Sequence, residues 1–153
     1  MSGRGAKMRK VDTREYVSVL KGLVEEGKEV SMLIAGTSMT PFLGHERDYI
    51  FFKTPDRELR KGDMVFYQRR SGQYVMHRIY KIEGGKYYMV GDAQTEIEGP
   101  LEREQIFAII TKVQRKGKWI TEGNFWWEFF EHVWLNVVPL RPIIVKIYMM
   151  FKK

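Results

Sequence analysis

Short apolar runs separated by turn residues dominate the middle of the chain. The run 30–35 ends at Gly36, and a second run spans 48–53. Runs of this length closed by turns are typical of strands. Hairpin turns at 69–72 and 83–86 and further apolar runs extend the pattern. The additional strands are predicted at 64–68, 74–82, 86–90 and 106–114. The pattern predicts a mainly β fold built on antiparallel strands.

The N-terminal part predicts one helix before the first strand. Asp12 or Thr13 can cap it, and it runs to about Glu26, with Gly27 as its stop. Its apolar residues recur at helical spacing, so we expect it to pack against the sheet. These residues are Tyr16, Val19, Leu20, Leu23 and Val24.

The composition changes from Gly117 onward. Residues 125–135 are crowded with aromatic side chains, Pro139 and Pro142 then interrupt, and 143–151 is apolar except for Lys146. Neither run approaches the roughly 20 apolar residues that span a bilayer. Aromatic residues with flanking lysines, here Lys152 and Lys153, are typical of segments at a membrane interface. We expect peripheral membrane contact; a helix packed on the sheet or a dimer contact is the alternative.

Length and composition favour one folded domain. The chain has 153 residues, of which 44% are hydrophobic and 29% charged, and we divide it into segments 1–29, 30–116 and 117–153. It has no cysteine, which excludes disulfides and thiolate metal sites. The histidines at 45, 77 and 132 lack metal-ligand spacing, so we expect neither a metal nor another cofactor.

The net charge of +7 suits nucleic acid or an anionic membrane. No arginine-rich helix or aromatic-basic strand motif is present, so we expect no nucleic-acid partner. The first ten residues are basic and polar, and no apolar segment follows them. This pattern predicts neither a secretory signal peptide nor an N-terminal membrane anchor. The expected location is cytoplasmic or peripheral on a membrane.

Candidate catalytic residues lie at the ends and on the faces of the predicted strands. Ser38 follows the first strand, where Gly36 makes a turn and Pro41 restricts its neighbour to extended geometry. His77 lies within the strand 74–82, and Asp92 and Glu98 lie in the loop after the strand 86–90. A serine, a histidine and an acid form the set that a serine hydrolase requires.

These strings resemble the serine peptidases of the signal peptidase and LexA superfamily. The family's nucleophile box, G-x-S-M-x-P, corresponds to 36–41, and its Gly-Asp box before a strand corresponds to 62–66. The string His77-Arg78-Ile79 matches the branch that uses a histidine base, found in endoplasmic-reticulum and archaeal signal peptidases. With the Gly-Asp at 91–92, the resemblance covers about residues 30–113.

The resemblance implies a coiled antiparallel sheet wrapped into a barrel-like body, with short helices at both ends. It also implies a serine endopeptidase that cleaves a signal or leader peptide, with Ser38 as nucleophile and His77 as base. Glu98 stands where that branch has its second acid, usually an aspartate, and Asp92 is the other candidate to orient the imidazole. The family's usual N-terminal anchor has no counterpart here.

Other interpretations of the same residues stay open. A histidine on an apolar strand face also fits a buried core residue, and His45 is a rival base in a polar turn. A LexA-like self-cleaving regulator would need a DNA-binding domain before the sheet, for which about thirty residues are too few. A non-catalytic module with a peptidase fold would not require Ser38 and His77 to lie together.

Overall fold

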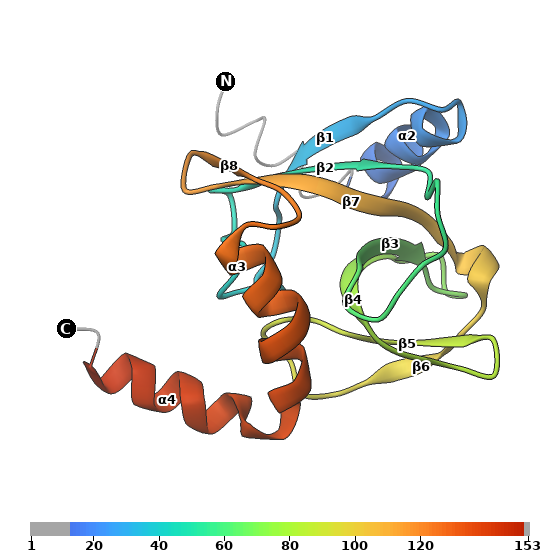
Figure 1. The fold of residues 1–153 in the computed structure, drawn as a ribbon. Coiled ribbons are helices and arrows are strands. Elements are labelled where there is room, and N and C mark those ends of the chain that lie inside the picture. Colours follow the sequence, from blue (N-terminus) through green and yellow to red (C-terminus); the bar gives the residue numbers. More distant parts are fainter. Residues whose placement is uncertain (1–12, 152–153) are drawn as a thin grey trace.

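The computed structural model describes residues 13–151 (Figure 1). The basic N-terminal stretch, the proposed cap Asp12, and the terminal lysines 152 and 153 lie outside these residues. The described chain forms eight antiparallel strands in the order β1-β2-β7-β3-β4-β5-β6, with β8 paired to β7. The strands are β1 Val30–Leu33, β2 Tyr49–Lys53, β3 Met64–Gln68, β4 Tyr74–Glu83, β5 Lys86–Val90, β6 Glu98–Leu101, β7 Ile106–Arg115 and β8 Lys118–Ile120. The prediction of a mainly β antiparallel fold with terminal helices is confirmed.

The sheet bends back on itself but is not closed. Within residues 13–151, the edge strands β1 and β6 do not pair with each other. The register shifts between Phe51 and Phe52, and again between Phe66 and Tyr67, help the strands to bend. The body is therefore an open coiled sheet.

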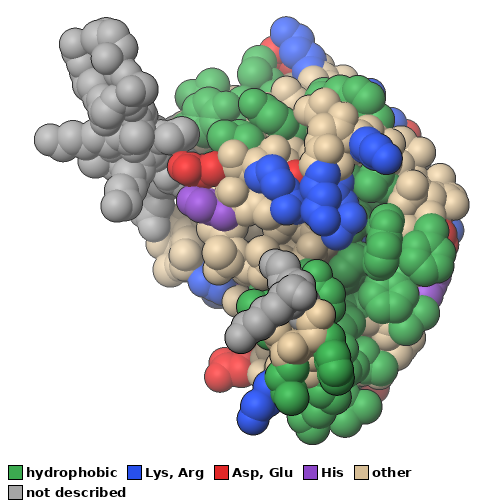
Figure 2. Space-filling view, turned by 90° about the vertical axis from the view of Figure 1, so that its left-hand side faces the viewer, with side chains coloured by type: hydrophobic (Ala, Val, Ile, Leu, Met, Phe, Trp, Pro, Cys, Tyr) green, Lys and Arg blue, Asp and Glu red, His purple; other side chains and the backbone are tan. Residues whose placement is uncertain are grey.

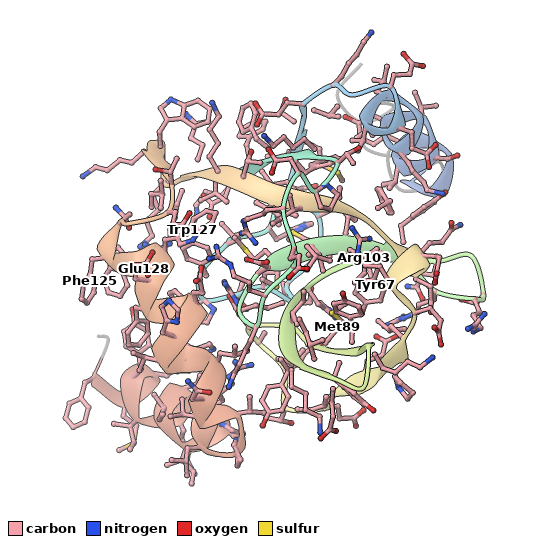
Figure 3. All side chains as sticks on the ribbon, turned by 45° about the vertical axis from the view of Figure 1, so that its right-hand side comes forward. Tyr67, Met89, Arg103, Phe125, Trp127 and Glu128 are labelled. Carbon is pink, nitrogen blue, oxygen red and sulfur yellow. The ribbon has the colours of Figure 1, made fainter. Side chains whose placement is uncertain are left out.

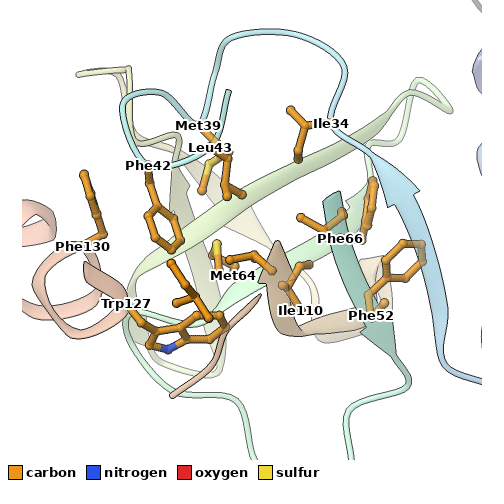
Figure 4. Packing of buried hydrophobic residues seen from close by; sticks show 14 of the residues in the cluster. Ile34, Met39, Phe42, Leu43, Phe52, Met64, Phe66, Ile110, Trp127 and Phe130 are labelled. Atoms are coloured by element: carbon orange, nitrogen blue, oxygen red, sulfur yellow. The ribbon is translucent and has the colours of Figure 1, made fainter. Parts of the chain in front are cut away.

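The larger hydrophobic core lies between the sheet and the helices. Side chains from the loop after β1, from the strands and from the C-terminal helices meet there, as Figure 4 shows. Phe42 is fully buried and packs at 4.9 Å from the ring of Phe130. A smaller core, centred on Tyr67, Ile79 and Met89, fills the space among β3, β4, β5 and β7. Burial of these apolar groups supplies the main stabilisation.

Helix α2 (Thr13–Glu25) forms as predicted, but its buried face differs from the expected one. Val17, Leu20 and Val24 are buried in the larger core, whereas Tyr16 and Val19 are exposed. The apolar residues of this helix are spread over more than one face, so the sequence did not decide which face is buried. Packing against the sheet buries the face with residues 17, 20 and 24.

Strands β6 and β8 were not predicted. Strand β6 reads Glu-Gly-Pro-Leu, which lacks a strand pattern, and it pairs with β5 through Tyr87 opposite Leu101 and Met89 opposite Glu98. A Cβ at Gly99 would lie 2.6 Å from the Tyr88 ring, so glycine permits this close approach. The pairing matters because it places Glu98 on the sheet.

The C-terminal part is helical and has two halves. The elements are α3 (Phe125–Glu128), η2 (Phe129–Val133), η3 (Trp134–Leu140) and α4 (Arg141–Phe151), and a short η1 (Arg103–Gln105) precedes β7. The first half packs Trp127, Phe130 and Trp134 against the body. The backbone leaves helical geometry at Val137, and α4 then runs away from the sheet (Figure 1).

Candidate active site

Ser38 lies in the loop that follows β1. Gly36 begins this turn with φ +97°, a conformation that favours glycine. The Ser38 carbonyl accepts a hydrogen bond from the Ala93 N–H at 2.9 Å, so the loop rests against the turn after β5. Its side chain is partly exposed, and within residues 13–151 the hydroxyl has no hydrogen-bond partner. The hydroxyl is therefore available to a substrate.

His77 lies on β4, opposite Val65 of β3, and is only 4% exposed. Ser38 and His77 line the same cleft, which has a volume of about 340 Å³. In the described chain no hydrogen bond joins the two side chains. Apo structures of serine hydrolases often show long contacts that tighten only with substrate. The fold thus brings to one cleft two residues that are 39 positions apart in the sequence.

A hydrogen-bonded chain runs from His77 to Glu98 through Tyr67. The Tyr67 hydroxyl lies 3.2 Å from His77 Nδ1 and donates to Glu98 Oε1 at 2.7 Å. Tyr67 lies in the smaller core beside Met89 (Figure 3). Arg69 holds the Glu98 carboxylate from its other side with two bonds of 2.8 Å. Glu98 therefore reaches the imidazole through a phenol and not directly.

This chain assigns the tautomer of His77. The Tyr67 proton goes to the carboxylate, so the phenol oxygen accepts from Nδ1–H. Nε2 is then the unprotonated nitrogen, which is the form that can take a proton from a serine hydroxyl. Burial, together with the bond to Glu98, raises the pKa of Tyr67, which keeps the phenol protonated.

The same surroundings set the charge of the other two groups. Burial lowers the pKa of His77 to about 4, although the Glu98 charge opposes the shift, so the imidazole is neutral at pH 7. Burial would raise the pKa of Glu98, but hydrogen bonds from Arg69 and Tyr67 lower it below its ordinary value. The site at neutral pH pairs a neutral base with an ionised acid.

Asp92, the other predicted acid, has a different environment. It is fully buried, and its two oxygens accept from Arg78 Nε and Nη2 at 3.0 Å each. Arg78 also donates to the Gly62 carbonyl, and Trp134 Nε1 donates to the Asp92 carbonyl. In the described residues His77 is not among the partners of Asp92. Asp92 of the Gly-Asp motif and Arg78 of the His-Arg motif therefore form a buried ion pair beside the cleft.

The rival base His45 belongs to the turn before β2. Its Nδ1 accepts from the Gly36 N–H at 2.7 Å, and it does not line the cleft. The N–H groups of Ser38 and Met39, by contrast, have no acceptor in the described part of the chain. Two free N–H groups beside a nucleophile can hold an oxyanion.

Tyr67, Arg69 and Gln94 were missed by the sequence reasoning, although all three line or support the site. A signal existed for Tyr67. Its place on a buried strand predicts that its hydroxyl must find a polar partner. Nothing local indicated that the partners would be a histidine 10 positions away and a glutamate 31 positions away.

One group of side chains has the composition of a metal site. Glu128, Glu131 and His132 place one ligand atom each within 4.8 Å of one another. His132 Nε2 lies 3.2 Å from Glu128 and 3.1 Å from Glu131, which describes an ion-paired cluster on the C-terminal helices. None of the three lines the cleft of Ser38 and His77.

Comparison with protein-family models, curated proteins and solved structures finds no match for this chain.

Proposed function

We propose that the protein is a serine endopeptidase that cleaves a signal or leader peptide. One observation carries the proposal: His77, held in the Nδ1–H tautomer by Tyr67, shares a cleft with the unpartnered hydroxyl of Ser38. A buried core histidine would satisfy both nitrogens within the core. In His77, Nδ1 is held by Tyr67, and Nε2 is left for the cleft that His77 lines.

The reaction would follow from this arrangement. Ser38 Oγ attacks the scissile carbonyl carbon while His77 Nε2 takes its proton. The developing oxyanion accepts from the N–H groups of Ser38 and Met39. The imidazolium then gives its proton to the departing amine, which leaves an acyl-enzyme on Ser38. A water, deprotonated by the same imidazole, hydrolyses the ester and returns the hydroxyl.

The cleft walls favour an extended apolar peptide. Met32, Ile34, Phe66 and Met76 contribute apolar side chains near the candidate nucleophile. Strand β1, which borders the cleft, has one edge unpaired within the described residues. An extended peptide can add to a free strand edge through main-chain hydrogen bonds. This geometry suits the apolar residues around the cleavage site of a signal or leader peptide.

We also propose that the C-terminal helix α4 lies in the membrane interface. Its side chains after Arg141 are exposed and mostly apolar on every face, which no single packed partner would cover. Figure 2 shows these hydrophobic side chains next to a group of Lys and Arg. Arg115 lies 5.4 Å from the exposed Trp126 ring, and Arg47 pairs with Asp48, whose carboxylate also accepts from the backbone N–H of Lys116. Such a mixture suits anionic headgroups.

The helical stretch Phe125–Phe151 is, by length and composition, long and apolar enough to cross a membrane. The two short apolar runs expected from the sequence thus lie in one helical stretch, which is kinked at Val137. Two observations favour interfacial contact over a span. Trp127, Phe130 and Trp134 are buried against the sheet. The 11 residues of α4 extend only about 16 Å, roughly half of a hydrocarbon core.

Site-directed variants and a serine-reactive fluorophosphonate test the catalytic proposal. Ser38→Ala and His77→Ala should each abolish labelling and nearly all peptide cleavage, and the double variant should lose little more, because the two residues act as a unit. Ser71→Ala, in the exposed hairpin after β3, is the matched control and should label normally. Strictly additive losses, or labelling that survives Ser38→Ala, would contradict the proposal. Fragments of the chain itself, absent in Ser38→Ala, would instead indicate the self-cleaving alternative.

Sedimentation with liposomes tests the membrane proposal on the full chain. The exposed residues Ile147 and Met150 can both be changed to Glu, which should release the protein from vesicles containing anionic lipid. Tyr16→Glu with Val19→Glu adds the same charge at exposed positions of α2 and should bind as wild type. If the wild-type protein never sediments with such vesicles, or if both double variants behave alike, α4 is a protein contact instead.

A further inference from the structure

The first residue of α4 is buried although the rest of the helix is exposed. Arg141 is only 2% exposed. Its Nη1 donates to the carbonyls of Gly91 and Gln94 at 2.8 and 2.9 Å, and its Nη2 donates to the carbonyl of Trp134 at 3.0 Å. One guanidinium therefore joins the C-terminal helices to both ends of the turn after β5.

That turn is the same one that supports Ser38. The Gln94 N–H donates to the Gly91 carbonyl, which closes the turn, and the Ala93 N–H donates to the Ser38 carbonyl. The two loops approach so closely that a Cβ at Gly91 would lie 2.6 Å from the Ser38 carbonyl oxygen. A shift of the turn would therefore move the backbone of Ser38.

The arrangement uses what distinguishes arginine from lysine. A planar guanidinium offers five N–H donors in a fixed fork, so it can bind several carbonyls at once. The bonds to Gly91 and Gln94 come from a single nitrogen, and those to Trp134 come from Nε and Nη2. A buried charge is tolerated only when it is well hydrogen-bonded, and these carbonyls meet that need.

We propose that Arg141 is a positioning residue for Ser38, tying the C-terminal helices to the turn that holds the nucleophile loop. The inference rests on the proposed function for its catalytic consequence, but the tether itself is independent of it. The path runs from Arg141 to the carbonyls of Gly91 and Gln94, and from the Ala93 N–H to the Ser38 carbonyl. The proposed membrane helix thus begins at a residue that supports the nucleophile loop.

The test compares Arg141→Met and Arg141→Lys with Trp127→Phe. Trp127 lies earlier in the C-terminal helical part, and its replacement removes one hydrogen bond, to Glu131. In the described residues no hydrogen bond joins Trp127 to the turn at 91–94. Amide hydrogen exchange is measured in all three full-length variants and in the wild type. We expect the Ala93 amide to exchange faster in both Arg141 variants, while amides in β3 and β7 keep their protection.

Kinetics on a soluble peptide form the second arm. A small displacement of a nucleophile costs about 10- to 100-fold in rate, so both Arg141 variants should lose that much kcat with KM within about twofold. The acidic limb of the pH profile should not move, because His77 is untouched. Trp127→Phe should keep its kcat whatever its melting temperature.

The outcomes separate the two proposals. Unchanged Ala93 exchange in Arg141→Met would overturn the tether, as would full kcat in Arg141→Lys, since charge alone would then suffice. A loss of protection throughout β3 and β7 would also overturn it, because Arg141 would then be a general stability residue. If the wild-type protein cleaves no peptide, the proposed function fails, and the Ala93 exchange still decides the tether.

Discussion

Replacing Tyr67 with phenylalanine would remove one hydroxyl from the site and leave the ring in place. The ring is fully buried in the smaller core, which can hold phenylalanine without a change of shape. The hydroxyl is the link between His77 Nδ1 and Glu98 Oε1, at 3.2 and 2.7 Å. Without it, the buried Nδ1–H loses its acceptor, and Glu98 keeps only its two bonds from Arg69.

The size of the effect follows from the bond that is lost. When Ser38 gives up its proton, His77 becomes an imidazolium, and its bond to the phenol becomes charge-assisted. Such bonds contribute about 1.5–3 kcal/mol. At 1.36 kcal/mol for each factor of ten, kcat should fall about 10- to 150-fold. The unpaired Nδ1–H should also lower the free energy of unfolding by about 1–3 kcal/mol.

The assay measures kcat, KM and melting temperature on a soluble peptide substrate. Tyr87→Phe is the matched control, because Tyr87 packs against the same core and, in the described residues, forms no hydrogen bond with His77. We expect Tyr67→Phe to lower kcat at nearly constant KM, and Tyr87→Phe to change neither. Glu98→Gln combined with Tyr67→Phe should lose less than the product of the single losses, since both act on one chain of bonds.

Two results would refute this reasoning. If Tyr67→Phe retains full kcat, the phenol does not support the imidazole. If Glu98→Gln lowers kcat while Tyr67→Phe does not, Glu98 acts on the substrate or on another group. The nitrogen chemical shifts of His77 offer an independent check, because the assigned tautomer requires the proton on Nδ1 in the wild type.

Three further predictions concern charge. The pKa of His77 in the free protein, about 4, places the acidic limb of kcat/KM near pH 4 and not near the ordinary value of about 6.5; a pH-rate profile checks this. Between pH 6.5 and 4 the unfolded chain binds a proton at that histidine and the folded chain does not. The free energy of unfolding should therefore fall by about 3 kcal/mol as the pH is lowered across this window. Denaturant titrations at several pH values would measure the fall, and His77→Asn should flatten the slope. Asp92→Asn should lower the free energy of unfolding by about 3–5 kcal/mol, and with it the melting temperature, by breaking the buried pair with Arg78. Glu98→Gln should act mainly on kcat. Thermal denaturation and kinetics on both variants check this, and a loss of stability in Glu98→Gln with a loss of kcat alone in Asp92→Asn would contradict it.

Several features followed from local sequence alone. Strands β3 and β5 have the predicted bounds, and β4 and β7 differ by a single residue at one end. Each is a short apolar run closed by a turn, for which tertiary contacts need not override local preference. The turn at Gly36 likewise follows from a glycine directly after an apolar run, and the structure gives it a positive φ.

Other features had no local signal. Strand β6 contains Gly99 and Pro100 and forms because β5 offers it an edge. The buried row of α2 was set by the sheet it packs on, since its sequence allowed more than one row. Asp92 and Glu98 are both acids of one loop, and only the packing shows that the first pairs with Arg78 while the second reaches Tyr67.

The sequence by itself determined the class of fold and the identity of the groups that could react, because turn chemistry, hydrophobic period and residue type are local properties. The tertiary structure decided which groups meet. It brought Ser38 and His77 to one cleft, interposed Tyr67 between the histidine and Glu98, and tied Arg141 to the turn behind the nucleophile. These contacts join residues 10 to 50 positions apart, so they depend on strand order and register. No local pattern encodes strand order and register; they emerge only when the whole sheet packs.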